Sequence, residues 1–153
     1  MPVITDPMSL PARTGTIYPE PFKDGFDGRL KRALAEQLGL TQFVINLTTL
    51  EPGARSAHRH WHDNQDEFIY ILSGEVTLFT DEGEQVLSPS MLAGFPAGDT
   101  NGHCLINKSA APATYLELGT RVADEVLTYP DIDLKAVKRD GKYTFLHKNG
   151  EPY

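Results

Sequence analysis

The alternation of apolar and polar residues predicts eight short β-strands between residues 41 and 120. Short apolar and β-branched segments recur there, and turn-forming residues such as Gly74, Gly83, Pro89 and Gly98 separate them. The predicted strands cover residues 41–50, 57–62, 67–72, 75–80, 84–87, 91–95, 103–107 and 114–120. Eight strands at this spacing favour a closed or nearly closed antiparallel β-barrel. The predicted fold class is therefore all-β.

The segments on either side of the predicted barrel have different patterns. Residues 1–26 carry five prolines and predict an extended arm, whose apolar residues Ile17, Tyr18 and Phe22 favour docking against a sheet edge or a partner subunit. Residues 27–38 have apolar positions at helical spacing between Asp27, a potential N-cap, and Gly39. We therefore expect one short amphipathic helix there.

The chain is expected to form one structural domain with three parts. These are an arm and short helix over residues 1–40, a barrel over 41–120, and a C-terminal extension over 121–153 that packs on the barrel. The extension contains two potential turns, at residues 139–142 and at Asn149-Gly150.

Composition and charge exclude several classes of function. Among 153 residues, 14 Lys and Arg stand against 21 Asp and Glu, and the net charge of −7 argues against nucleic acid and anionic membranes as partners. The longest strongly apolar run covers only residues 68–72, and no signal peptide pattern opens the chain. The single cysteine, Cys104, cannot form an internal disulfide, which predicts a reducing, cytoplasmic location.

Histidines and a nearby carboxylate indicate a metal site. His58, His60 and His62 would share one face of a strand because successive side chains alternate between faces. If residues 63–66 form a loop, His62 and Glu67 pair across a hairpin and project from the same face. Imidazole and carboxylate ligands suit a divalent transition metal. The alternative is a solvated strand face, but Glu67 opens the most apolar strand of the chain and needs a partner there.

The spacing of these residues resembles two motifs of the cupin superfamily. In the first, six residues separate Gly53 from His60-Trp61-His62, four more lead to Glu67, and six more lead to Gly74. The second consists of Pro96-Ala97-Gly98, then His103, three residues and Asn107. Together the motifs cover residues 53–107, with strand-like flanks from about 41 to 120.

The match departs from the superfamily pattern in three places. Six rather than five residues separate Gly53 from His60, four rather than two separate Gly98 from His103, and Ser90 stands where the second motif starts with Gly. Small loop insertions account for the spacings. In an alternative register, His58 and His60 form the ligand pair, although the gap to the acid is then longer than in the superfamily.

The resemblance implies a double-stranded β-helix, or jelly-roll barrel, that holds one divalent metal ion on three histidines and one glutamate. The matching positions are His60, His62, Glu67 and His103. The ion would be Fe, Mn, Ni, Zn or Cu, because all accept these ligands. Similar small cupins often pair through sheet edges or exchanged arms, which implies a homodimer.

Strand alternation indicates further residues of a substrate pocket. Asn101 and Asn107 share the face of His103, although Asn107 could instead stabilise a turn. Ile69 and Ile71 share the face of Glu67 and would form an apolar wall. Asn46 interrupts an apolar strand and is a further candidate.

No free Asp, Lys or Tyr is expected to face this pocket. His58 is then the spare titratable group near the metal and the candidate catalytic base.

We therefore expect a mononuclear metalloenzyme that acts on a small organic molecule. Open coordination positions and an apolar wall favour dioxygenase-type oxidation. A metal-dependent isomerase, epimerase or lyase that acts through an enolate is the alternative at the same site. A non-catalytic cupin that binds or senses a small ligand is the alternative from another class.

Overall fold

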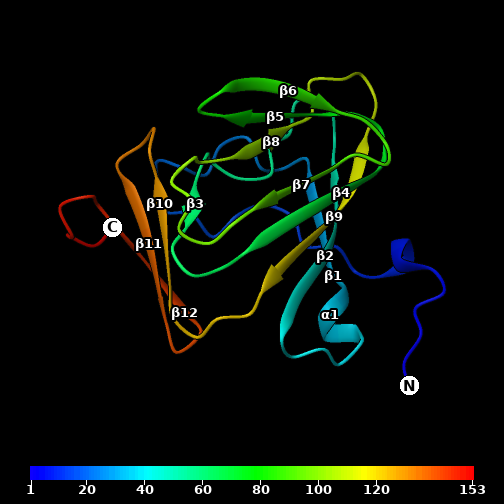
Figure 1. The fold of residues 1–153 in the computed structure, drawn as a ribbon, viewed down its shortest axis with the longest axis horizontal. Coiled ribbons are helices and arrows are strands. Elements are labelled where there is room, and N and C mark those ends of the chain that lie inside the picture. The colour runs from blue at the N-terminus through cyan, green and yellow to red at the C-terminus, as the bar shows by residue number, and fades with distance from the viewer.

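Twelve antiparallel strands form three sheets around a common interior in the computed structural model of residues 1–153 (Figure 1). The sheets have the strand orders β1-β2-β9-β4-β7, β6-β5-β8 and β12-β11-β10-β3. The strands are β1 (Arg29–Ala33), β2 (Phe43–Leu50), β3 (Trp61–His62), β4 (Glu67–Ser73), β5 (Val76–Thr80), β6 (Gly83–Leu87), β7 (Leu92–Phe95), β8 (Cys104–Ile106), β9 (Ala113–Thr120), β10 (Glu125–Tyr129), β11 (Leu134–Arg139) and β12 (Lys142–Leu146). The all-β barrel expected from the sequence is confirmed.

Each of the eight strands predicted from the alternation overlaps an observed strand, but one is much shorter than expected. The strand predicted over residues 57–62 is reduced to β3. The preceding residues make isolated bridges, Arg55 to Ile106 and His60 to His103, instead of a continuous ladder. The Ser56 hydroxyl also accepts a hydrogen bond from the backbone N–H of Leu105, which interrupts regular pairing.

The helix predicted over residues 27–38 is confirmed only for its last part, because its first part forms a strand. Residues Arg29–Ala33 form β1, which pairs with β2 from Arg29 opposite Leu50 to Ala33 opposite Asn46. Only one turn of helix follows, α1 (Leu34–Gln37), and Ala33 rather than Asp27 stands at its N-cap position. Backbone pairing with the edge of the large sheet outweighs the weak helical preference of this segment.

The N-terminal arm lies along the edge of the large sheet. After a short 3₁₀ helix, η1 (Pro7–Ser9), Arg13 pairs with Lys31 of β1 through two backbone hydrogen bonds of 2.9 Å. Farther along the arm, Tyr18 and Phe26 are buried against the C-terminal strands. Neither helix is long and apolar enough to cross a membrane.

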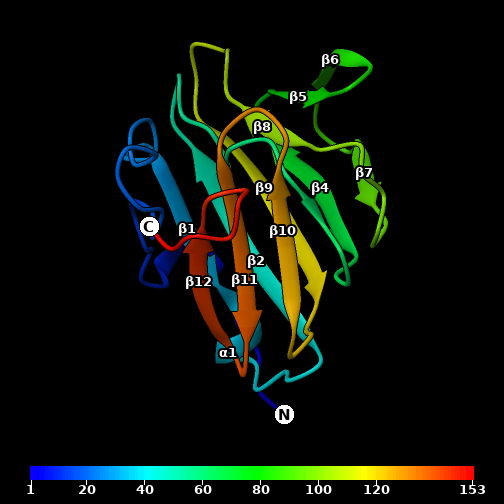
Figure 2. The same cartoon turned by 90° about the vertical axis from the view of Figure 1, so that its left-hand side faces the viewer.

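The C-terminal segment forms a sheet layer of its own. Figure 2 shows β10, β11 and β12 in front of the strands of the large sheet. Asp140 and Gly141, both with positive φ, form the tight turn between β11 and β12. Because β10 pairs with β3, this segment is hydrogen-bonded directly to the strand that carries His62.

Two apolar clusters hold the sheets together. One contains Ile69, Ile71 and Tyr115 of the large sheet with Leu78 and Leu105 of the three-stranded sheet. The other joins the N-terminal arm to the C-terminal sheet. A cavity borders both clusters and contains the candidate functional site.

Candidate metal centre

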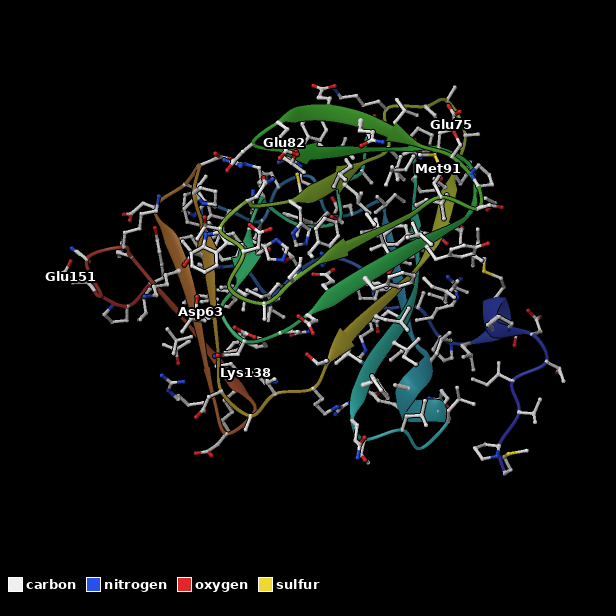
Figure 3. All side chains as sticks on the ribbon, in the orientation of Figure 1. Asp63, Glu75, Glu82, Met91, Lys138 and Glu151 are labelled. Atoms are coloured by element: carbon white, nitrogen blue, oxygen red, sulfur yellow. The ribbon has the colours of Figure 1, made fainter.

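Four candidate ligands come from segments that belong to all three sheets. His62 lies in β3 and Glu67 is the first residue of β4. His60 immediately precedes β3, and His103 immediately precedes β8. The backbones of His60 and His103 bind each other through hydrogen bonds of 3.1 and 2.8 Å, which places their side chains next to each other. Asp63, labelled in Figure 3, lies in the loop that joins β3 to β4.

The predicted pairing of His62 with Glu67 across a hairpin is wrong, although the two side chains do meet. β3 pairs with β10, while β4 pairs with β7 and β9. The loop therefore crosses from one sheet to another. The carboxylate of Glu67 nevertheless lies 3.3 Å from His62 Nε2.

The ligand atoms converge on one point. His60, His62 and Glu67 each offer an atom within 4.8 Å of the others, and His60 Nε2 lies 3.2 Å from His62 Nε2. His103 Nε2 lies 3.2 Å from Glu67 Oε2, which places it next to this group. Ligand atoms about 2.1 Å from a shared ion lie about 3.0–3.4 Å from one another in octahedral or tetrahedral geometry. The observed spacings fit a single divalent ion.

The protonation states of the buried ligands also fit a metal ion. Burial and the neighbouring imidazoles of His103 and His62 lower the pKa of His60 to about 3. Burial alone would raise the pKa of Glu67, but the neighbouring imidazoles of His103 and His62 hold that pKa well below its usual range. At neutral pH His60 is thus neutral and Glu67 is anionic, the states that a metal ion requires.

Contacts outside the ligand set fix two of the imidazole rings. His60 Nδ1 donates to the carbonyl of His58 at 2.9 Å, which leaves the Nε2 lone pair facing the site. The ring of Phe95 stacks on His103, with centroids 3.6 Å apart and an interplanar angle of 9°. These rings are oriented by the protein itself.

The ligand set lines a cavity of about 280 Å³ between the large sheet and the C-terminal sheet. β2, β4 and β9 contribute Asn46, Ile69 and Glu117, because the ladder places these three residues side by side. β1 adds Lys31, and the C-terminal strands add Lys138, which is labelled in Figure 3. The cavity is therefore more polar than the apolar wall expected from the sequence.

A carboxylate and an ammonium group form a pair within this cavity. Lys31 Nζ donates to Glu117 Oε1 at 2.8 Å, and Asn46 Nδ2 donates to the same oxygen at 3.1 Å. Glu117 Oε2 has no hydrogen-bond partner. Glu117 is mostly buried, with 16% of its side chain exposed. A carboxylate held this way can exchange a proton with a ligand in the cavity.

Tyr115 supplies a hydrogen-bond donor near Glu117. Its side chain is fully buried and lines the same cavity. Burial and the charges of Glu117 and Glu67 raise the pKa of Tyr115 well above its usual value. The phenol therefore stays protonated at neutral pH.

Three further cations line the cavity without a carboxylate partner. Arg29 Nη2 donates to the carbonyl of Gly15 at 2.6 Å, and Lys138 Nζ donates to that of Val122 at 2.8 Å. Arg121 Nη2 lies 3.4 Å from the carbonyl of Phe43. Backbone carbonyls satisfy these donors without neutralising them, so positive charge remains available for an anionic ligand.

The structure places His58 away from the metal centre. Its Nε2 lies 2.9 Å from the carbonyl of Phe22, and its ring packs against Tyr18 and Phe26 of the N-terminal arm. His58 does not line the cavity that contains the ligand set. The expectation that three imidazoles share one face is wrong, because the backbone at His58 bends instead of continuing β3.

The other predicted pocket residues divide into two groups. Asn46 and Ile69 line the cavity, and Asn101 lines a second, smaller cavity that reaches His62 and His103 from the other side. Ile71 is packed in the apolar core instead. Asn107 is fully buried, and its side chain bonds the backbone of Leu50, Ser109 and Ala111. It stabilises the turn after β8 and does not line either of these cavities.

The expectation that no free Asp, Lys or Tyr faces the pocket is wrong, because Lys31 and Tyr115 line the cavity, together with Glu117, which the sequence analysis did not single out. Lys31 falls in the range predicted as helix, but it lies in β1, ahead of α1. Glu117 carried a usable signal, because a carboxylate between Leu116 and Leu118 in an apolar strand must face the opposite side of the sheet.

Comparison with known proteins gives a consistent result. A family model described as a cupin domain matches residues 46–119. No curated protein sequence matches the chain. A crystal structure from Silicibacter pomeroyi, described as a sugar phosphate isomerase from a cupin superfamily, has 41% sequence identity and a TM-score of 0.93. The match covers 97% of this chain and 94% of that chain.

Two further solved structures are more distant. A proposed sugar phosphate isomerase from Acidithiobacillus ferrooxidans has 25% identity and a TM-score of 0.76, over 84% of this chain and 81% of that chain. The polyketide cyclase RemF from Streptomyces resistomycificus has 20% identity and a TM-score of 0.62, over 78% and 80%. The latter similarity concerns the fold alone.

Proposed function

This chain belongs to the cupin superfamily, and from that premise we propose that it is a metal-dependent isomerase of a small phosphorylated sugar. The observation that carries the proposal is the pair of Glu117 and Lys31 in the cavity that contains the ligand set. An oxidation performed by metal and substrate alone would not require this acid–base pair, whereas an isomerisation would. The similarity to the Silicibacter pomeroyi sugar phosphate isomerase supports the same choice.

His60, His62, Glu67 and His103 would hold the proposed metal ion. When bound, a divalent ion supplies positive charge that polarises a carbonyl or hydroxyl oxygen of the substrate. The chain itself supplies the proton transfers of the reaction.

Interconversion of an aldose and a ketose moves one carbon-bound proton to the adjacent carbon. Glu117 takes this proton through its unpartnered Oε2 and returns it to the neighbouring carbon, while a hydroxyl proton passes to the former carbonyl oxygen. Lys31 holds the carboxylate in place through its hydrogen bond to Oε1, and the protonated phenol of Tyr115 is available to donate a hydrogen bond to a ligand in the cavity. The product has the same atoms and the same net charge as the substrate.

The cations of the cavity account for the proposed phosphate group. Arg29, Arg121 and Lys138 face the cavity with their charge uncompensated, in a chain whose net charge is −7. A dianionic phosphate would be attracted to this part of the cavity in spite of the overall negative charge.

The reaction is tested by following deuterium incorporation. Protein loaded with Mn, Fe, Ni, Zn or Cu is incubated in D₂O with a panel of aldose and ketose phosphates, and proton NMR follows the carbons next to the carbonyl. We expect interconversion with deuterium exchange at those carbons. Oxygen consumption without interconversion would instead favour the dioxygenase that the sequence alone favoured.

The role of Glu117 is tested by Glu117→Gln. Loss of the base predicts that kcat falls by about 10²–10⁴-fold while the metal content stays the same. Glu75→Gln, which neutralises an exposed carboxylate outside the cavity, is the matched control and should retain full activity. Full turnover by Glu117→Gln would remove Glu117 from the proposed reaction.

The exposed apolar residues of the large sheet support a homodimer. Phe43, Phe68, Leu72 and Leu92 lie on the face of this sheet opposite the cavity, and each is at least 36% exposed. Light scattering coupled to size exclusion should give twice the mass of one chain, and Phe68→Glu should reduce it to one chain. A wild-type mass of one chain would exclude the dimer. A cytoplasmic location also stays a prediction, which rests on the single cysteine.

A further inference from the structure

Glu125 is a fully buried carboxylate in the C-terminal segment. It is the first residue of β10, the strand that pairs with β3 and places Leu127 opposite His62. Its neighbour in the sequence, Asp124, is exposed. A buried carboxylate destabilises the folded state unless hydrogen bonds compensate for its lost hydration, so each of its oxygens calls for a partner.

Only one of its two oxygens is satisfied. Oε1 accepts hydrogen bonds from the backbone N–H groups of Asn64 at 3.0 Å and Val126 at 2.8 Å. Asn64 belongs to the loop between the two candidate ligands His62 and Glu67, so this oxygen holds the loop in place. Oε2 is buried and has no partner.

A potential partner for this oxygen is a ring nitrogen of His62. His62 Nδ1 is also buried without a partner, and it lies 3.9 Å from Glu125 Oε2. Its other nitrogen, Nε2, faces the metal centre. A buried donor and a buried acceptor therefore face each other, and a shift of about 1 Å would bring them to hydrogen-bond distance.

We infer that Glu125 is a positioning residue of the metal centre, which accepts the Nδ1 proton of His62 and so keeps the Nε2 lone pair free for a metal ion. His60 is held by the same device, since its Nδ1 donates to the carbonyl of His58. Carboxylate partners of this kind orient ligating histidines and raise their basicity. The inference rests on the metal ion of the proposed function, but not on the proposed reaction.

The variant Glu125→Gln separates this role from a structural one. The amide oxygen of Gln can still accept from Asn64 and Val126, while its NH₂ group replaces Oε2. A donor would then face His62 Nδ1 and place the ring proton on Nε2, toward the metal. Asp124→Asn removes a neighbouring carboxylate of the same charge at an exposed position and serves as the matched control.

The first readout is metal affinity, measured by competition with a chelator for Zn²⁺ and Co²⁺. We expect Glu125→Gln to weaken binding by about 10- to 100-fold and Asp124→Asn to leave it unchanged. Equal affinities in the wild type and Glu125→Gln would overturn the inference and leave the metal centre intact. If the wild type binds no metal, the proposed function fails independently.

The second readout needs no metal, and the result for the wild type alone can contradict the inference. Long-range ¹H–¹⁵N correlation of the imidazoles in the metal-free wild type, assigned with His62→Asn, reports which nitrogen of His62 carries the proton. We expect Nδ1 to be protonated in the wild type and Nε2 in Glu125→Gln. Protonation of Nε2 in the wild type would contradict the inference.

Discussion

The charge state of individual buried residues decides how the metal centre responds to pH. His60 is neutral and Glu67 is ionised at neutral pH, because the pKa of each lies below its ordinary value. The folded protein therefore presents a neutral imidazole and an anionic carboxylate to a cation before any cation binds. The surroundings of His60 and Glu67 make protonation of either side chain less favourable in the folded protein than in the unfolded chain.

The metal-free protein should lose stability as the pH falls below about 6.5. Between pH 6.5 and about 3, His60 is protonated in the unfolded chain but not in the folded one. The unfolded state then binds more protons, so the free energy of unfolding decreases by about 1.4 kcal/mol for each pH unit. Glu67 acts in the same direction below its ordinary pKa, because its pKa is also lower in the folded state.

Urea unfolding of metal-free protein at a series of pH values measures this dependence. His60→Gln, which removes the titrating ring, should flatten the curve between pH 6.5 and 4 by about one proton's worth of slope. A wild-type stability that stays constant or increases as the pH falls would contradict the assigned protonation state.

The proximity of the candidate ligands could be predicted from spacing, whereas neighbours that depend on strand pairing could not. The separations of His60, His62, Glu67 and His103 along the chain predict one cluster, and the structure brings their side chains together; their role as metal ligands stays a prediction. The position of Lys31 in the cavity could not be predicted, because its strand forms by pairing with β2, a contact that the local sequence does not encode.

At the scale of elements, strand positions were predictable because alternation and turn residues are local signals. The partners of those strands were not. The sequence favoured a hairpin between the segments of His62 and Glu67, whereas β3 pairs with β10, more than 60 residues away. Ser90 has a φ of 74°, a backbone conformation that favours Gly, at the position where the cupin motif has Gly.

Gly74 is the turn residue that should tolerate substitution least. It has a φ of +71°, and a Cβ would lie 2.5 Å from the carbonyl oxygen of Pro112 and 2.7 Å from Ala113 Cα. Gly74→Ala combines backbone strain with a clash against backbone, so we expect it to lower the free energy of unfolding by about 2–4 kcal/mol.

Gly83 provides the matched comparison for this experiment. It also has positive φ, but nothing lies within 4 Å of its Cβ position. Gly83→Ala should therefore cost only the backbone strain, about 1–2 kcal/mol. Equal losses for the two variants in thermal or urea unfolding would show that the contact at Gly74 contributes nothing.

At the scale of the whole molecule, the terminal segments do more than extend the barrel. The arm and the C-terminal strands share an apolar cluster, and both line the cavity through Tyr18, Leu127 and Lys138. The sequence indicated that these segments pack on the barrel, but it did not show that they build the cavity. That result depends on contacts between the two ends of the chain, which no local pattern records.

A metal ion at the four candidate ligands would connect segments that belong to all three sheets. Elemental mass spectrometry on untagged protein purified without chelators measures metal per chain, with His103→Ala analysed in parallel. We expect close to one equivalent of a divalent transition metal per chain in the wild type and a much lower metal content in His103→Ala. A folded wild-type protein that carries no metal and takes none up on reconstitution would contradict this expectation.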